Sequence, residues 1–179
     1  DYDRMMERTS NRPLAAKRWS PSSALVIAGI FSLFGIILLA LLNPLTSFLG
    51  TLSLVTYAFL YTPLKRYSPV SVIVGAIPGA LPVLIGMIAH DGVVTTGALF
   101  LFAIQFIWQF PHFWSIGFLS YDQYKHAGYK LLPEDDGQID RRLGTQTLVY
   151  TCLLIPVIAI GFIMQLISIW GAIGVVLVS

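Results

Sequence analysis

The sequence predicts an all-α membrane protein, built as a polytopic bundle of transmembrane helices. Hydrophobic residues make up 56% of the chain and charged residues 11%, and the mean hydropathy is +0.76. Soluble domains, by contrast, carry about 25% charged residues. The apolar residues gather in runs of about 18–25 residues, long enough to cross roughly 30 Å of hydrocarbon as helices. No segment alternates with a period of two, so membrane strands are not expected.

Five apolar runs are long enough to span a membrane, and a sixth begins near the end of the chain. The runs are 22–42, 45–62, 68–89, 95–119, 146–167 and a partial one from about 169. We therefore expect a single transmembrane domain over residues 1–179, with about five full spans and a partial one. Because the chain starts at Asp1 without an initiator Met and stops at Ser179 inside an apolar run, we expect it to be incomplete at both ends. Cys152 is the single cysteine, which excludes an internal disulfide.

All eleven Lys and Arg residues fall on one side of the membrane if each run crosses it once. The segments on that side are residues 1–20, 63–67 and 120–144. The opposite loops, near 43–44 and 90–92, hold no Lys or Arg. Because a basic excess in short loops marks the cytoplasmic side, we expect a multi-pass protein of the bacterial cell membrane with its active-site loops in the cytoplasm. Lys65 and Arg66 directly follow the helix-ending Pro63, and simple anchoring explains this pair equally well.

The third run carries helix-breaking residues in its middle. Gly75 and Gly79 favour close packing against a neighbouring helix. Pro78 and Pro82 favour a kinked helix that lines a cavity, because neighbours or a cavity must then satisfy the freed carbonyls. Packing is the simpler interpretation of the glycines.

The fourth run places Gln109 and His112 at membrane depth, beside Pro111. Polar side chains there are expensive and are therefore candidates for function. A hydrogen bond to a neighbouring helix explains such a histidine equally well.

Acidic and basic side chains alternate at the start of the chain, as Asp1, Asp3 and Glu7 with Arg4, Arg8 and Arg12. If residues 1–8 end a helix, Asp3 and Glu7 share one of its faces. Carboxylates beside guanidinium groups suit a magnesium–phosphate ligand. A solvated juxtamembrane turn, or a basic stretch touching anionic lipid, is the commoner outcome for such a charge run, so both hypotheses stay open.

A second candidate site follows the fourth run. Tyr121 and Lys125 are four residues apart and share one face if the segment is helical. A positive charge and a hydroxyl donor on one face suit a diphosphate. Asp135 and Asp136 stand next to Gly137, but the other ligand positions of a calcium loop are absent, so we predict a solvated turn there.

Five strings in the same order resemble the haem O synthases, the protoheme IX farnesyltransferase family of the UbiA prenyltransferase superfamily. The strings are 1–14 (DYDRMMERTSNRPL), 61–66 (YTPLKR), 75–82 (GAIPGALP), 108–114 (WQFPHFW) and 121–133 (YDQYKHAGYKLLP). The resemblance covers about residues 1–145. Other members of the superfamily usually carry a second Asp-xxx-Asp motif where this chain has Tyr121 and Lys125, as the haem O synthases do.

The resemblance implies a UbiA-like bundle of nine helices whose active site opens to the cytoplasm. It implies transfer of a farnesyl group from farnesyl diphosphate to a vinyl group of haem b, giving haem O for haem–copper oxidase assembly, with Mg²⁺ as cofactor. The lipid bilayer is an implied partner, haem A synthase is a candidate partner, and no nucleic acid is expected.

The resemblance also implies roles for individual residues. Asp3 matches the last carboxylate of the family's first motif and Asp1 the intervening acid, so both are predicted metal ligands. The earlier acid and Asn of that motif would precede Asp1. Asp3, Tyr121 and Lys125 are the predicted catalytic residues. The predicted substrate-binding residues are Arg8, Arg12, Lys65 and Arg66, with His112 as the candidate for haem contact.

The same residues leave three other hypotheses open. A sister enzyme that prenylates an aromatic acid, a quinone precursor or a chlorophyllide shares the fold, and the second motif disfavours it. A small membrane transporter with a polar midplane site is disfavoured because the polar residues gather at one mouth. A purely structural membrane subunit would leave the clustered acids unexplained.

Overall fold

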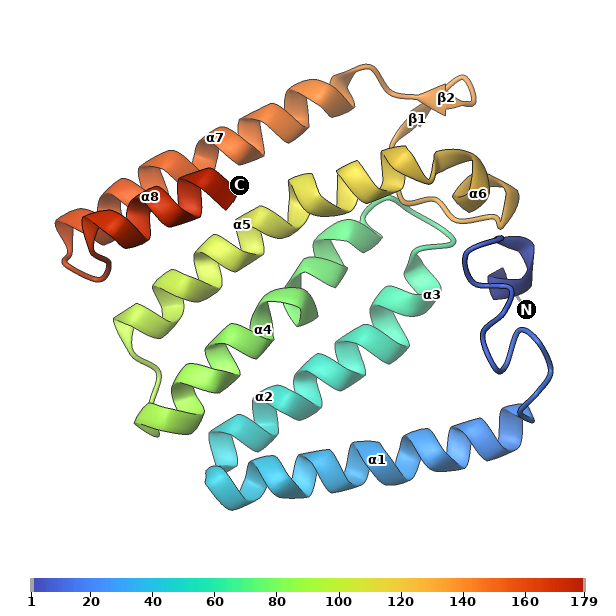
Figure 1. Cartoon of the computed structure of the whole chain (residues 1–179), viewed down its shortest axis with the longest axis horizontal. Coiled ribbons are helices and arrows are strands. Elements are labelled where there is room, and N and C mark those ends of the chain that lie inside the picture. The colour runs from blue at the N-terminus through green and yellow to red at the C-terminus, as the bar shows by residue number, and fades with distance from the viewer. Residues whose placement is uncertain (1, 179) are drawn as a thin grey trace.

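The computed structural model describes residues 2–178, with side-chain surroundings for residues 2–175, and its long helices run side by side (Figure 1). The helices are α1 (Pro21–Leu42), α2 (Pro44–Val55), α3 (Thr62–Leu64), α4 (Ser71–Asp91), α5 (Thr96–Leu119), α6 (Tyr121–His126), α7 (Arg142–Ile163) and α8 (Ile169–Val178). A π-helical turn, Thr56–Tyr61, joins α2 to α3, and a 3₁₀ turn, Tyr2–Met5, opens the described chain. A short hairpin of β1 (Glu134–Asp135) and β2 (Gln138–Ile139) precedes α7.

Five of these helical stretches are long and apolar enough to cross a membrane, which confirms the all-α polytopic prediction. Each span coincides with a predicted run to within a few residues. The fifth differs most, because α7 ends at Ile163 although the apolar residues continue. There Gln165 adopts a left-handed φ of 58°, and the Leu166 N–H donates to the Gly161 carbonyl at 2.9 Å. Such a closing bond over a left-handed residue is a common helix end.

The helix ends explain how the chain reverses so tightly between spans. Asn43 caps α2 through the Thr46 amide, and its side-chain amide also donates to the Ile88 carbonyl of α4 at 3.1 Å. Thr95 caps α5 through the Ala98 amide, and Gly92 ends α4 with a φ of 75° that suits glycine. These turns lie together at one end of the bundle.

Consecutive spans pack against one another, from α1 through α2, α4 and α5 to α7. Glycines admit large side chains at three of these contacts. A Cβ on Gly75 would lie 2.7 Å from the Tyr61 ring, and a Cβ on Gly79 would lie 2.8 Å from the Gln109 amide. A Cβ on Gly161 would lie 2.1 Å from the Phe100 ring of α5. The packing role predicted for Gly75 and Gly79 is confirmed, because a side chain at either position would collide with the neighbouring helix.

Of the expectations about local structure, the shared helical face of Asp3 and Glu7 is wrong and the solvated turn near Asp136 is confirmed. α4 runs from Ser71 to Asp91 without interruption, with Pro78 and Pro82 inside it. Residues 2–5 form a 3₁₀ turn followed by further turns, so Asp3 and Glu7 do not share the face of an α-helix. The segment folds back on itself at this point, since the Thr9 hydroxyl donates to the Asp3 carbonyl at 2.7 Å. The predicted solvated turn is confirmed, as the exposed two-residue loop of the β1–β2 hairpin, with Asp136 and Gly137 at positive φ.

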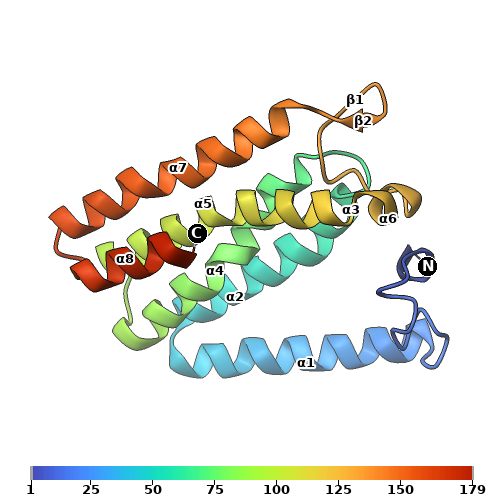
Figure 2. The same cartoon turned by 45° about the horizontal axis from the view of Figure 1, so that its top comes forward.

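The loops that carry the basic residues share one end of the bundle. The N-terminal segment, the α3–α4 connection, α6 and the hairpin all lie there in both views (Figures 1 and 2). The turns between α1 and α2, α4 and α5, and α7 and α8 lie at the opposite end. The predicted same-side placement of the polar segments is therefore confirmed.

Candidate functional site

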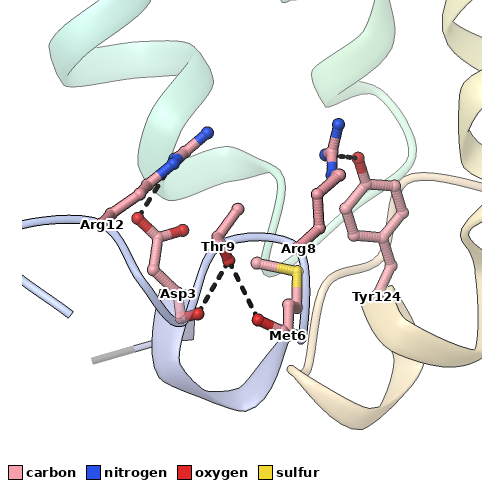
Figure 3. Close-up of polar contacts among 6 residues, drawn as sticks. All are labelled: Asp3, Met6, Arg8, Thr9, Arg12 and Tyr124. Carbon is pink, nitrogen blue, oxygen red and sulfur yellow. Dashed lines mark hydrogen bonds and ion pairs between the residues drawn. The ribbon is translucent and has the colours of Figure 1, made fainter. Parts of the chain in front are cut away.

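The segment from Tyr2 to Arg18 folds into a compact cap at the polar end of the bundle. Thr9 is 2% exposed, and its hydroxyl donates to the Asp3 carbonyl at 2.7 Å (Figure 3). Met6 is buried in the same turn, and the Arg4 guanidinium donates to the Ala15 carbonyl at 2.5 Å. These contacts tie the two ends of the segment together and fix the position of Asp3.

Asp3 and Arg12 form an ion pair at the edge of a pocket of about 420 Å³. An Asp3 carboxylate oxygen lies 3.1 Å from the Arg12 guanidinium, and the two side chains are 38% and 60% exposed. Lys65, Thr62 and Tyr129 line the same pocket. The acid and the guanidinium of the N-terminal cap therefore meet the ammonium of Lys65, from the end of α3, around one opening. Such a set of charges suits a phosphate anion that binds together with a metal cation.

Lys65 is the best-positioned cation of this pocket. It directly follows α3, is half-buried, and its ammonium lies 4.7 Å from the centre of the Tyr129 ring and 5.8 Å from that of Tyr61. The Lys65 carbonyl accepts the Lys130 N–H at 2.8 Å, so the two loops are joined through their backbones. Burial lowers the pKa of Lys65, and the neighbouring Asp3 carboxylate partly opposes that shift.

Arg66 and Arg8 extend the cationic surface to either side. The Arg66 guanidinium lies 4.1 Å from the centre of the Tyr2 ring and lines an adjoining pocket of about 400 Å³ that shares Lys65 and Tyr129. Arg8 donates to the Tyr124 hydroxyl of α6 at 3.3 Å (Figure 3). Cation–ring contacts of this kind hold long side chains in place while leaving their N–H donors free for a ligand.

Tyr121 and Lys125 contact the β1–β2 hairpin instead of the Asp3 pocket. The Lys125 ammonium donates to the Tyr121 hydroxyl at 3.2 Å and to the Gly137 carbonyl. The Tyr121 hydroxyl donates to a Glu134 carboxylate oxygen at 2.9 Å. The hydrogen bond to Tyr121 is the main cause that raises the pKa of the fully exposed Lys125. The shared face predicted for this pair is present, but its neighbour in the described structure is the hairpin.

His112 lies within the α5 span and does not line the Asp3 pocket or the pocket that adjoins it. Its ring stacks on Trp108, four residues earlier, with ring centres 4.4 Å apart and planes 19° apart. Gln109, also predicted to be functional or structural, is buried and donates to the Gly79 carbonyl at 3.4 Å. The structural hypothesis therefore accounts for Gln109, while the haem contact of His112 stays a prediction.

The sequence does not single out three pocket residues, Tyr2, Thr62 and Tyr129, or Tyr124, the partner of Arg8. Tyrosines near basic residues at a span end are usually interfacial anchors, so the sequence does not mark these tyrosines as site residues. The signal that could have found it is the pairing of aromatic and basic residues in all three polar segments.

The lining of the Asp3 pocket offers a metal ion one carboxylate, that of Asp3 itself. Within residues 2–178, no group of three or more His, Cys, Asp or Glu side chains is arranged to hold a metal. Asp1, the second predicted metal ligand, lies outside the described residues. A single carboxylate is still compatible with Mg²⁺, which proteins commonly bind through one or two carboxylates together with substrate phosphates.

The lowered pKa of Lys65 predicts how anion binding depends on pH. As pH rises through this pKa, Lys65 loses its proton, and it does so at lower pH than an ordinary lysine. In the full-length protein, the dissociation constant for inorganic diphosphate should rise about tenfold per pH unit above that pKa, because only the charged ammonium attracts the anion. Lys65→Arg should abolish the rise, since arginine stays protonated. The pH profile of this dissociation constant for both forms is the measurement, and identical profiles would remove Lys65 from the anion site.

The chain was compared with known proteins. The family model described as "UbiA prenyltransferase family" matches residues 1–179. The chain is 42% identical over 174 residues to a protein named protoheme IX farnesyltransferase from Christiangramia forsetii, covering 97% of this chain and 55% of that protein. Proteins of the same name from Flavobacterium johnsoniae (44% identity, 87% of this chain, 51% of theirs) and Cytophaga hutchinsonii (42%, 96% and 59%) are similar. The chain thus spans little more than half the length of these relatives. No solved structure matches it.

Proposed function

The chain belongs to the UbiA prenyltransferase family, and from that premise we propose that its protein is a haem O synthase. The reaction transfers a farnesyl group from farnesyl diphosphate to a vinyl group of haem b. The bond between farnesyl C1 and diphosphate oxygen breaks, C1 bonds to the outer vinyl carbon, and water adds a hydroxyl to the inner one with loss of a proton. The relatives' names support this substrate pair.

The observation that carries the proposal is the meeting of Asp3, Arg12 and Lys65 around one pocket at the end of a membrane bundle. Arg12 and Lys65, with Arg8 and Arg66 at the flanks, provide N–H donors for the diphosphate oxygens. Members of the family generally use a divalent metal, and we propose Mg²⁺ with Asp3 as one ligand. When bound, the ion would offset the charge of the leaving diphosphate.

Product mass tests this function directly. The full-length protein, incubated with haem b, farnesyl diphosphate and Mg²⁺, should yield a haem heavier by one farnesyl group and one hydroxyl group. A parallel incubation replaces haem b with an aromatic acid acceptor. A prenylated aromatic acid and unchanged haem b would assign the protein to the sister enzymes instead.

The basic residues also predict the orientation of this multi-pass membrane protein. We propose that the end carrying the polar segments faces the cytoplasm, because all eleven Lys and Arg lie in segments at that end. Single cysteines introduced at positions 10, 66 and 130 should resist an impermeant thiol reagent in sealed cells. Cysteines at positions 43 and 91 should react. External labelling at position 130 would contradict both the orientation and a cytoplasmic site. An association with a haem A synthase in that membrane stays a prediction.

A further inference from the structure

A third pocket at the polar end lies apart from the residues proposed for catalysis. It has a volume of about 540 Å³ and lies between the end of α5 and the start of α7, with the hairpin as a third wall. Its size is within the roughly 300–1,000 Å³ of small-molecule sites. The walls are mainly apolar, from Trp114, Phe118, Leu119 and Leu143, and Arg141 lies at the rim.

Arg141 and its neighbour Arg142 differ from the other arginines of the described chain. The others have partners: Arg4 with Ala15, Arg8 with Tyr124, Arg12 with Asp3, Arg18 with Asn11 and Arg66 with Tyr2. Within residues 2–178, neither Arg141 nor Arg142 has a side-chain hydrogen bond, ion pair or ring contact. Asp140, the nearest acid in sequence, instead accepts the backbone N–H of Arg142 at 2.8 Å. Arg141 therefore lines the apolar pocket together with Asp140, one of whose carboxylate oxygens accepts the backbone N–H of Arg142, and Arg142 follows directly in the chain.

The pocket lies between the ends of two candidate membrane spans, where lipid headgroups would meet the hydrocarbon. Leu119 is the last residue of one span and Arg142 the first of the next. Phe118 and Leu119 are 61% and 84% exposed, so the pocket wall continues into an apolar outer surface. An occupant with an anionic head and apolar chains would match both features. Basic pockets between transmembrane helices are a known setting for anionic lipid headgroups.

We propose that this pocket binds an anionic phospholipid of the adjacent leaflet. The phosphate lies at Arg141, with Arg142 adding to the local positive potential, and an acyl chain lies against Phe118 and Leu143. Such a site goes beyond the proposed prenyl transfer, since Asp3, Lys65 and Tyr129 do not line it. Bound lipid would also hold together α5, α7 and the hairpin, whose Ile139 forms part of the wall.

The test uses the full-length protein in mixed micelles of phosphatidylglycerol and phosphatidylcholine with identical acyl chains. Native mass spectrometry measures which lipid stays bound. We expect phosphatidylglycerol to be retained preferentially, and Arg141→Gln to reduce that preference about fivefold, the factor for about 1 kcal/mol per basic side chain. Lys17→Gln removes one charge at the same end of the bundle, outside the pocket, and should leave the preference unchanged.

A second variant keeps Arg141 and fills the pocket. Gly144 lines it, and a Cβ there would meet nothing within 4 Å, so Gly144→Leu begins in open space and adds volume to the pocket. It should displace the lipid, while the α7 helix tolerates leucine. Equal retention in Arg141→Gln, Gly144→Leu and Lys17→Gln would show lipid bound elsewhere and overturn the proposal. So would displacement of the lipid by haem b together with weaker haem binding in Arg141→Gln, since the pocket would then belong to the substrate.

Discussion

Replacing Asp3 with Asn should lower the kcat of the proposed farnesyl transfer about 100-fold or more in the full-length protein, while membrane insertion stays normal. The substitution keeps the size of the side chain but removes an anionic oxygen at the pocket that also holds Arg12 and Lys65. Loss of a group that acts mainly in the transition state lowers kcat and kcat/KM together. Steady-state kinetics over a series of Mg²⁺ concentrations measures both parameters.

Glu7→Gln is the matched control for Asp3→Asn. Glu7 belongs to the same N-terminal cap, is exposed, and is not among the residues that line the Asp3 pocket. It should retain the parent kcat. Arg12→Gln breaks the 3.1 Å ion pair but leaves the Asp3 carboxylate. It therefore separates the ion-pair role of Asp3 from its proposed role as a metal ligand. Near-normal turnover of Asp3→Asn in saturating Mg²⁺ would show that Asp3 is only a surface acid.

The spans could be predicted from sequence because the hydrocarbon of a membrane requires a long run of mainly apolar residues in a helical conformation. Residues 22–42, for example, became α1 almost residue for residue. The exact end of α7 could not be predicted, since it depends on Gln165 adopting a left-handed conformation inside an apolar run. The π-helical turn at Thr56–Tyr61 has no compositional signal either. Local hydrogen bonding, which hydropathy does not report, decides both.

The charged residues of the candidate site could be predicted from the sequence, but the side chains that surround them could not. Lys65 had a plain alternative as an anchor, and only the fold shows it beside Asp3 and between two tyrosine rings. Tyr129 could not be predicted as a neighbour of Lys65, because its position depends on the backbone hydrogen bond between Lys130 and Lys65, which are 65 residues apart in the sequence. Contacts of this length are set by the packing of loops and cannot be deduced from spacing within one segment.

Lys125 offers the sharpest choice between a catalytic and a structural role. If Lys125 binds diphosphate, as predicted from its family position, then it must exchange its bond to the Gly137 carbonyl for a substrate oxygen. Lys125→Ala should then raise the KM for farnesyl diphosphate about tenfold, because a charge-assisted hydrogen bond is lost. Lys125→Asp should be worse, since it places an anion beside the leaving group. KM and kcat for both variants are the measurement.

Glu134→Gln distinguishes a Lys125 that binds diphosphate from a Lys125 that only anchors the hairpin. The Glu134 carboxylate accepts the Tyr121 hydroxyl at 2.9 Å, so the variant weakens the hairpin's attachment while leaving Lys125 in place. If Lys125 merely anchors the hairpin, Glu134→Gln and Lys125→Ala should impair transfer to a similar degree. If Lys125 binds diphosphate, Glu134→Gln should leave the KM equal or lower, because a competing acid near the ammonium has been neutralised. An unchanged KM and kcat in Lys125→Ala would remove this residue from the site and leave Lys65, Arg12 and their neighbours as the diphosphate contacts.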